Sequence, residues 1–391
     1  MVAVIYIVLA SAMFFLQDTY FLVGGVEFSL KNPCAVGILF LALLNFTVTV
    51  RPGRTIVLIR HTVIQVFPYL IPFFFSAIIW VVSGADSITI VNGVGMIVPQ
   101  ILSVLIAAAT LYLFGEKGAL YCLGAMCVAN FIKVLTVAME GGIGDFTFAF
   151  GPFLIYLLLW RKKIPHTFLW FFVTLILFLL GLKRIAVPAV ALGFVVAIFV
   201  RMLPKKAARQ AAMCLAAGMI IVSFMYIVGI RSGLFLYMEE KLGINTMGRM
   251  AMFANLEPYY DISITYMGKG TGFERFVDWA SGVEYQVPLR TLMPIHNDFL
   301  RMYMNIGFAG YWIWIISFLM VRLHYWFRRA GKEAGCLFLG ISIYCFVLYA
   351  TDNTIYYPYT MIACAILPMS CCLDRLADAE MEEHRTRWEK D

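Results

Sequence analysis

The sequence predicts an all-α, polytopic integral membrane protein with about 10–12 transmembrane helices and one long extracytoplasmic loop. Two observations indicate this class. First, 62% of the 391 residues are hydrophobic and only 14% are charged, and the mean hydropathy is +0.86, which excludes an ordinary soluble domain. Second, apolar segments recur along the chain at about the 20 residues that a helix needs to cross the hydrocarbon core of a bilayer.

About twelve segments come close to this length. They cover residues 2–24, 34–50, 62–82, 93–115, 118–138, 147–160, 167–182, 185–203, 211–230, 297–321, 336–351 and 357–372. Several are short for a full span, so the count lies between ten and twelve. The first segment has neither a basic start nor a small-residue cleavage site, and we expect it to be retained rather than removed as a signal peptide.

These segments divide the chain into four parts. Residues 1–230 form an N-terminal bundle of transmembrane helices, and residues 231–295 form an extracytoplasmic loop with short interfacial helices. Residues 296–372 form the C-terminal transmembrane helices. The mixed-charge tail, residues 373–391, is expected to be a solvated cytoplasmic helix.

Orientation follows from the lysine and arginine residues. Most of the 30 basic residues lie in one set of alternate connections: 51–60, 117, 161–163, 201–209, 322–332 and the tail. Short loops rich in lysine and arginine stay in the cytoplasm. Both termini are therefore predicted to be cytoplasmic, and the loop 231–295 is predicted to face outward.

Positive charge on the outward side runs against this bias and suggests anion binding. Arg184 follows Lys183 in a turn between two apolar segments, where a charge is costly unless it is used. Arg249 lies in an apolar stretch, 246–255, that is expected to form an interfacial helix. The alternative is that the loop arginines pair with nearby glutamates and aspartates.

The loop also contains Tyr259 and Tyr260, followed by the glycine-rich stretch 268–273. The tyrosines are candidates for stacking on sugar rings, although aromatic residues at an interface also serve as membrane anchors. The glycines could bring backbone N–H groups to a phosphate or sugar, but the stretch matches neither phosphate-binding glycine motif.

Polar residues gather where the loop ends and the next span begins, at His296, Asn297, Asp298 and Arg301. A histidine at the rim of a helix can accept a proton near neutral pH. In the alternative interpretation Asn297 and Asp298 cap the helix, Arg301 neutralises Asp298, and His296 has no chemical role.

The order of these features resembles the O-antigen polymerase and O-antigen ligase superfamily of bacterial polysaccharide assembly. The resemblance covers residues 170–360. It rests on the following elements in order: Lys183-Arg184, Gly248-Arg249, Gly268-Lys269-Gly270-Thr271-Gly272, His296-Asn297-Asp298-Phe299-Leu300, Gly307 and Gly310, and Thr351-Asp352-Asn353.

The resemblance implies a GT-C-like, metal-independent glycosyltransferase in the bacterial cytoplasmic membrane, with its active site facing outward. The donor would be a glycan linked through pyrophosphate to undecaprenol, transferred with inversion to another lipid-linked repeat unit. His296 or Asp298 would be the base, and Tyr259, Tyr260 and Asn297 would contact glycan. The cations expected at the pyrophosphate are Arg184, Arg249, Arg290 and Arg301, because planar guanidinium groups bind phosphate oxygens in pairs.

Two alternatives remain at this stage. An O-antigen ligase would use the same donor but transfer the glycan to lipid A core, and a flippase for lipid-linked oligosaccharide would have similar hydropathy. A transporter typically has internal repeats and ionisable groups near the membrane midplane, and only Lys133 and Asn130 were expected well inside a span.

We expect no cofactor and no metal, because the sequence has neither an Asp-x-Asp pair nor a zinc motif. The nine cysteines lie mostly in apolar runs, without a CxxC pair, which disfavours disulfides and thiolate metal sites. The partners implied are the lipid-linked oligosaccharide, membrane lipid and a protein that regulates chain length, and no nucleic acid.

Overall fold

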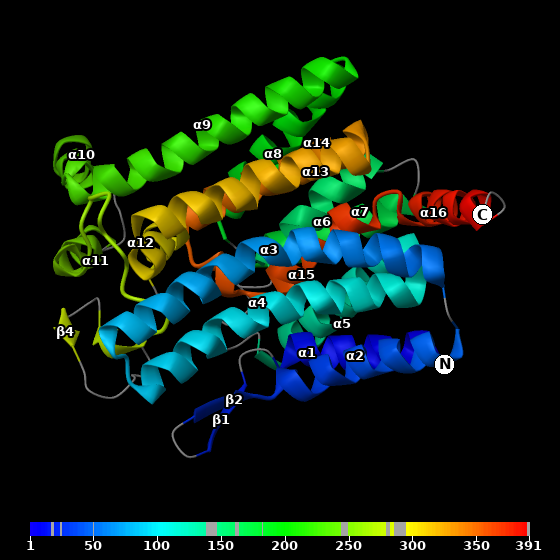
Figure 1. Cartoon of the computed structure of the whole chain (residues 1–391), viewed down its shortest axis with the longest axis horizontal. Coiled ribbons are helices and arrows are strands. Elements are labelled where there is room, and N and C mark those ends of the chain that lie inside the picture. Colours follow the sequence, from blue (N-terminus) through cyan, green and yellow to red (C-terminus); the bar gives the residue numbers. More distant parts are fainter. Residues whose placement is uncertain are drawn as a thin grey trace.

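Each of the twelve apolar segments coincides with a helical segment in the computed structural model (Figure 1). The structure describes residues 1–16, 19–23, 26–49, 51–137, 147–160, 164–181, 183–243, 249–278, 282–284 and 295–388. The helices in the first part of the chain are α1 (Val2–Phe15), α2 (Lys31–Val48), α3 (Pro52–Ser83), α4 (Ser87–Phe114), α5 (Gly118–Val137), α6 (Thr147–Trp160), α7 (Thr167–Leu180), α8 (Ala186–Met202) and α9 (Lys205–Arg231).

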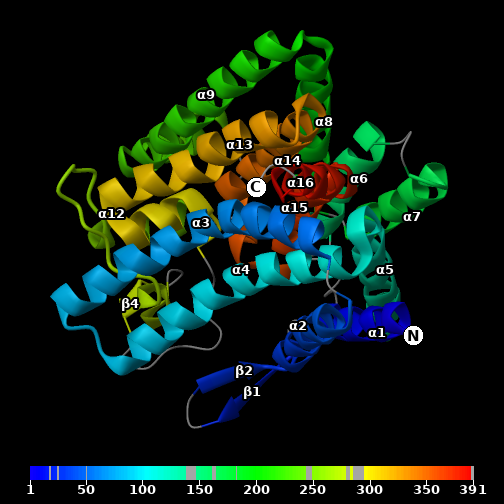
Figure 2. The same cartoon turned by 45° about the vertical axis from the view of Figure 1, so that its right-hand side comes forward.

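The second part of the chain contains the loop and the C-terminal helices. Its elements are α10 (Leu234–Leu242), α11 (Arg249–Leu256), α12 (Asp298–Ile316), a π-helical turn (Ser317–Val321), α13 (Arg322–Arg329), α14 (Lys332–Thr351), α15 (Pro358–Ser370) and α16 (Leu373–Trp388). Short 3-10 turns include η4 (Phe273–Phe276) and η6 (Thr354–Tyr356). The long helices lie side by side, and both termini lie at one end of the bundle (Figures 1 and 2).

Within the described residues, six apolar helical runs are long and apolar enough to cross a membrane, or seven if α15 and the first part of α16 form one bent span. One of the six runs includes both α4 and α5, which meet at a turn with positive φ at Gly115. Large apolar side chains such as Val81, Phe168 and Phe199 are exposed on the outer helices. Such wide apolar exposure fits a bilayer and not water.

The buried centre of the bundle is formed by α12, α14 and α15, and small residues allow its close packing. A Cβ atom on Gly193 of α8 would lie 2.5 Å from the carbonyl oxygen of Gly340 on α14. The two helix backbones are therefore in direct contact, as small residues permit in membrane bundles.

Helix α12 is broken at Gly307, whose φ of 69° and ψ of −173° are not helical. The loop segment 266–271 lies against this break. The N–H of Lys269 donates to Met304 O, that of Gly270 to Asn305 O, and that of Phe308 to Tyr266 O, each at 2.8 Å. The loop therefore supplies the hydrogen bonds that the helix loses, as non-helical backbone buried in a membrane protein requires.

One expectation about the end of a span is wrong. The first apolar segment does not continue to residue 24, because α1 ends at Phe15 and an antiparallel hairpin of β1 (Tyr20–Val23) and β2 (Val26–Ser29) follows. A smaller hairpin pairs β3 (Val277–Asp278) with β4 (Val283–Glu284). The aromatic and β-branched residues before Gly24-Gly25 are typical of a hairpin and were taken for a helix.

The tail is helical as predicted, but it is not simply solvated. In α16, Asp374 pairs with Arg54 of α3, and Glu380 pairs with Arg60, with N–O distances of 2.8 Å. Gly53 of α3 lies against the backbone of Ala377. We refer to this end of the bundle, which also contains both termini, as the tail end, and to the opposite end, which contains His296, as the site end.

Candidate functional site

The N-terminus of α12 lies at the site end. The side chain of Asn297 caps the helix, because its Oδ1 accepts a hydrogen bond from the Leu300 N–H at 2.9 Å. Asn297 is fully buried, which argues against contact with glycan, and its predicted role as a helix cap is confirmed. The cap fixes the preceding residue, His296, whose side chain is 35% exposed at the rim.

The partner of His296 is Asp352, in the turn that follows α14. Nδ1 of His296 lies 3.4 Å from Oδ1 of Asp352, and the same carboxylate oxygen accepts a hydrogen bond from the Asn353 N–H at 2.8 Å. Tyr357 donates to the side-chain oxygen of Asn353 at 2.9 Å. A half-exposed imidazole is thus held by a nearly buried carboxylate.

The electrostatics of Asp352 follow from these contacts. Burial alone raises the pKa of Asp352, but the hydrogen bonds from His296 and from the Asn353 N–H, together with the charges of His296 and Lys183, outweigh burial. The pKa of Asp352 therefore lies below its usual value. The carboxylate is ionised at neutral pH and can orient the imidazole.

Asp298, the other candidate base, is fully buried. Its Oδ2 accepts a hydrogen bond from the Ile355 N–H at 2.9 Å, which ties η6 to the start of α12. The burial of Asp298 and this hydrogen bond support a structural role, which leaves His296 as the candidate base.

Arg301 is not free to bind a pyrophosphate. Its Nε donates to Oε1 of Glu274 at 2.5 Å, both side chains are almost fully buried, and the guanidinium lies 4.0 Å from the centre of the Tyr356 ring. Arg301 was expected to neutralise Asp298, but it pairs mainly with Glu274. This agrees with the alternative that the loop arginines pair with nearby glutamates and aspartates. Arg231 similarly pairs with Glu257.

Other cations described at the site end include Lys183, Arg184 and Arg249. Lys183, in the turn before α8, acts on Asp352 electrostatically, and its Nζ lies 5.3 Å from the Phe148 ring centre. Arg184 beside it is exposed. Arg249 begins α11, so the predicted short helix is present. Its positive charge interacts electrostatically with Tyr226, whose hydroxyl lies close to Asn297. Arg290 lies outside the described residues.

The aromatic and glycine candidates are placed differently from expectation. Tyr260 is buried, with Arg231 5.7 Å from its ring centre, so it cannot stack on a sugar, whereas Tyr259 is half-buried against Phe273. The glycine stretch is structural: Thr271 N–H donates to Ser76 Oγ at 2.9 Å, and a Cβ on Gly272 would meet α4. Its N–H groups at 269–271 already bond to protein atoms.

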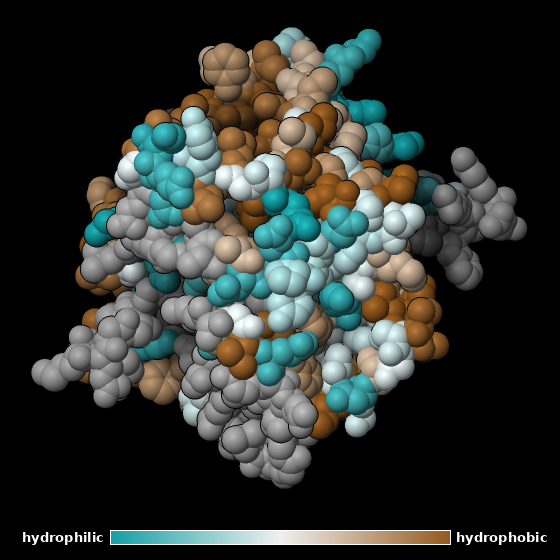
Figure 3. Space-filling model, turned by 90° about the vertical axis from the view of Figure 1, so that its left-hand side faces the viewer, coloured by the Kyte–Doolittle hydropathy of each residue, from teal (hydrophilic) through white to brown (hydrophobic). Residues whose placement is uncertain are grey.

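The residues that meet at the site end come from distant parts of the chain. Lys183 lies in the turn before α8, Tyr226 on α9 and Arg249 at the start of α11. His296 directly precedes α12, and Asp352 lies in the turn after α14. Hydrophilic residues gather across this end of the molecule, with apolar residues around its edge (Figure 3). The turn containing Asp352 could be noticed in the sequence, but its pairing with His296 could not.

Comparisons with known proteins add no assignment. No protein-family model matches the sequence, and no curated protein is significantly similar to it. The site must therefore be interpreted from its own chemistry: an oriented imidazole, a buried carboxylate and cations from two sides. Among the described residues, no group of three or more His, Cys, Asp or Glu side chains could hold a metal ion.

Proposed function

We propose that the protein is a membrane-embedded glycosyltransferase of the O-antigen polymerase type. It would transfer a glycan from undecaprenyl pyrophosphate to the non-reducing end of another lipid-linked repeat unit, at the outer face of the bacterial cytoplasmic membrane. The observation that carries the proposal is the His296–Asp352 pair at the rim of the bundle, with Lys183 and Arg249 on neighbouring elements.

His296 would act as the general base. With Asp352 ionised, Nδ1 of His296 carries its proton toward the carboxylate, and Nε2 is left as an acceptor. The acceptor hydroxyl gives its proton to Nε2 while its oxygen attacks the anomeric carbon. Asp352 stabilises the imidazolium that forms, as the carboxylate does in other His–Asp pairs.

The leaving group is a lipid pyrophosphate that gains negative charge as the bond from the anomeric carbon to oxygen breaks. Fixed cations stabilise such charge without a metal. We propose that Arg249 and Arg184 bind the pyrophosphate. Lys183 joins them because it lies near Asp352. Arg301 is excluded from it by its pair with Glu274.

Two other functions would involve the same protein differently. An O-antigen ligase would use the same site with lipid A core as the acceptor. A flippase is favoured by one observation, the buried Arg322–Gln65 contact inside the bundle, because ionisable groups at membrane depth are typical of transport pathways.

The test is glycan profiling of a deletion strain that expresses the wild type or one of the variants His296→Ala, Asp352→Asn and Arg249→Ala. We expect the first two to lower polymer formation about 10²–10⁴-fold, the usual contribution of a general base. Single repeat units on lipid A core without long chains would support the polymerase. Long lipid-linked chains that are never attached would instead indicate the ligase.

Asp86→Asn provides a matched control. Asp86 is an exposed carboxylate that caps α4 by accepting the Thr89 N–H, and asparagine caps helices equally well, so this variant should keep full activity. Normal glycan in the His296→Ala strain, with the variant detected in the membrane, would refute the proposed site. Lipid-linked units trapped in the cytoplasmic leaflet would establish the flippase.

A further inference from the structure

Arg322 was expected in a cytoplasmic connection, but it lies inside the bundle and is only 5% exposed. The predicted span 297–321 does not end at residue 321, because the π turn joins α12 to α13 in one helical run from Asp298 to Arg329. Nη1 of Arg322 donates to Gln65 Oε1, and its Nε donates to Phe318 O, both at 2.8 Å. Among the described residues no carboxylate pairs with Arg322.

A buried charge without a counter-charge is strongly disfavoured in a membrane protein. The rings of Phe318 and Phe338, with centres 4.0 and 5.2 Å from the Arg322 guanidinium carbon, offset part of this cost. The partners of Arg322 are therefore neutral: an amide, a carbonyl, the side chain of Tyr69 and two aromatic rings. In the part of the chain that the structure describes, its positive charge is left without a negative group.

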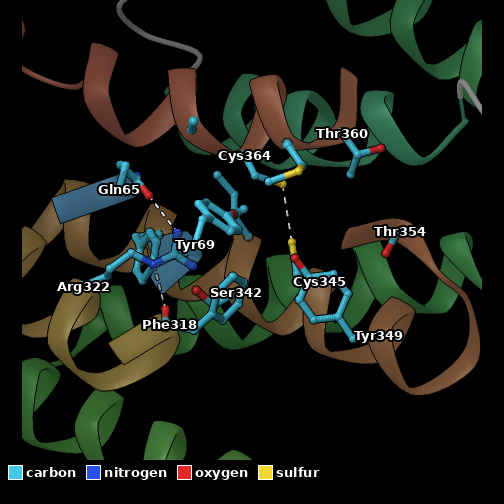
Figure 4. Close-up of a pocket in the computed structure, with 14 residues that line it drawn as sticks. Gln65, Tyr69, Phe318, Arg322, Ser342, Cys345, Tyr349, Thr354, Thr360 and Cys364 are labelled. Carbon is cyan, nitrogen blue, oxygen red and sulfur yellow. Dashed lines mark hydrogen bonds between the residues drawn. The ribbon is translucent and has the colours of Figure 1, made fainter. Parts of the chain in front are cut away.

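A cavity next to Arg322 is lined by hydrogen-bond donors (Figure 4). Gln65, Tyr69, Ser342, Thr360 and the thiols of Cys345 and Cys364 border it, and none of its lining residues is acidic. Tyr69 interacts with Arg322. Gln65 Nε2 and Thr360 Oγ1 are buried and have no hydrogen-bond partner.

The backbone beside the cavity is also unusual. The π turn at Ser317–Val321 directly precedes Arg322 and contains Phe318, whose carbonyl and ring both contact the guanidinium. Single π turns inside α-helices occur frequently at functional sites. The π turn therefore adds an irregular backbone to the unpaired charge and the cavity at the same place.

We propose that the cavity beside Arg322 binds a small monovalent inorganic anion such as chloride. The unpaired guanidinium supplies the charge, and Gln65 and Tyr69, which lie beside it in Figure 4, supply neutral donors. The cavity is small, which favours a monatomic anion over a phosphate or a carboxylate ligand. The site goes beyond the proposed glycosyl transfer and does not depend on it.

The test measures the thermal unfolding midpoint of the full chain, purified in detergent, in chloride, bromide or gluconate salts at equal ionic strength. Gluconate is too large for the cavity, so we expect the wild-type midpoint to rise by several degrees in either halide, since a ligand that binds only the folded state stabilises it. Retention of radiolabelled chloride by the protein should accompany the rise. Arg322→Met should abolish both effects.

Arg60→Met is the matched control, because Arg60 is half-exposed and pairs with Glu380, so its halide response should equal that of the wild type. Tyr69→Phe retains Arg322 and removes the hydroxyl of a lining residue beside it. It should weaken chloride retention at least several-fold, which keeps the test decisive if Arg322→Met fails to fold. A wild type without chloride retention or halide response would overturn the proposal. An equal response in Tyr69→Phe and the wild type, or an Arg322→Met variant that still retains chloride, would do the same.

Discussion

At the scale of single residues, the site end separates into an accessible pair and a buried pair. His296 and Asp352 lie at the rim, where the imidazole is about one-third exposed. Arg301 and Glu274 lie below them and are almost completely buried. The two pairs contain the same kinds of charge, but only the first can exchange a proton with a substrate.

The buried pair should therefore govern stability. In Arg301→Met, Glu274 loses the only hydrogen-bond partner that its carboxylate has among the described residues. Removing one member of a buried ion pair costs about 3–5 kcal/mol, so we expect a lower unfolding midpoint and a lower yield in the membrane. The double variant Arg301→Met, Glu274→Gln should recover part of the loss, and Arg184→Ala, at an exposed position, should unfold like the wild type. An Arg301→Met variant of wild-type stability would show that the pair contributes little.

The pH dependence should reveal the accessible pair. Because the pKa of Asp352 is lower in the folded chain than the usual value of about 4, its ionised form stabilises the folded state above that value. This contribution is lost as pH falls through the folded pKa. We expect the unfolding midpoint of the wild type to fall more steeply below about pH 4 than that of Asp352→Asn. Parallel curves for the two proteins would contradict the assignment of the lowered pKa to this group.

At the scale of elements, the positions of the helices could be predicted and their interruptions could not. Runs of apolar residues predict where a helix crosses a bilayer, and each run coincides with a helix. In the sequence Gly307 is a lone glycine inside an apolar run, a pattern that usually indicates close helix packing. Its left-handed φ depends on the loop segment near Met267, about forty residues earlier, which no local pattern reveals.

The same reasoning explains which parts of the site could be predicted. The Asn297 cap is local, four residues long, and typical of a helix start. The contacts of His296 with Asp352 and of Arg301 with Glu274 join residues 56 and 27 positions apart. Their residue types were visible in the sequence, but their pairing is decided by how α12 packs against the loop and the turn after α14.

The broken helix gives a prediction of its own. A Cβ on Gly307 would lie 2.3 Å from the carbonyl carbon of Met267, and its φ of 69° would strain any other residue by about 1–3 kcal/mol. We expect Gly307→Ala to lose most folded protein. Gly218 of α9 has nothing within 4 Å of an added Cβ, so Gly218→Ala should be neutral or stabilise the helix by up to about 1 kcal/mol. Equal unfolding midpoints for the two variants would contradict the break in α12.

At the scale of the whole molecule, the arrangement of charge links the fold to orientation. The tail end contains Arg54, Arg60, Arg201 and Lys332, together with α16. Cations concentrated at one end of a bundle favour the cytoplasm. The glycosyltransferase proposal needs this orientation, because it places His296 and Asp352 on the side where the lipid-linked donor is consumed.

Reporter fusions at the N-terminus, after residue 388 and between α10 and α11 test the fold and its orientation in the membrane independently. Both termini lie at the tail end and the loop helices lie at the site end (Figure 1), so the two terminal reporters must agree with each other and differ from the loop reporter. We expect a reporter that fluoresces only in the cytoplasm to be active at both termini, and a phosphatase that works only outside to be active in the loop. The reversed pattern would retain the fold but place His296 in the cytoplasm, which excludes transfer at the outer face. Disagreement between the two termini would contradict the bundle itself, because no orientation of this fold puts them on opposite sides of a membrane.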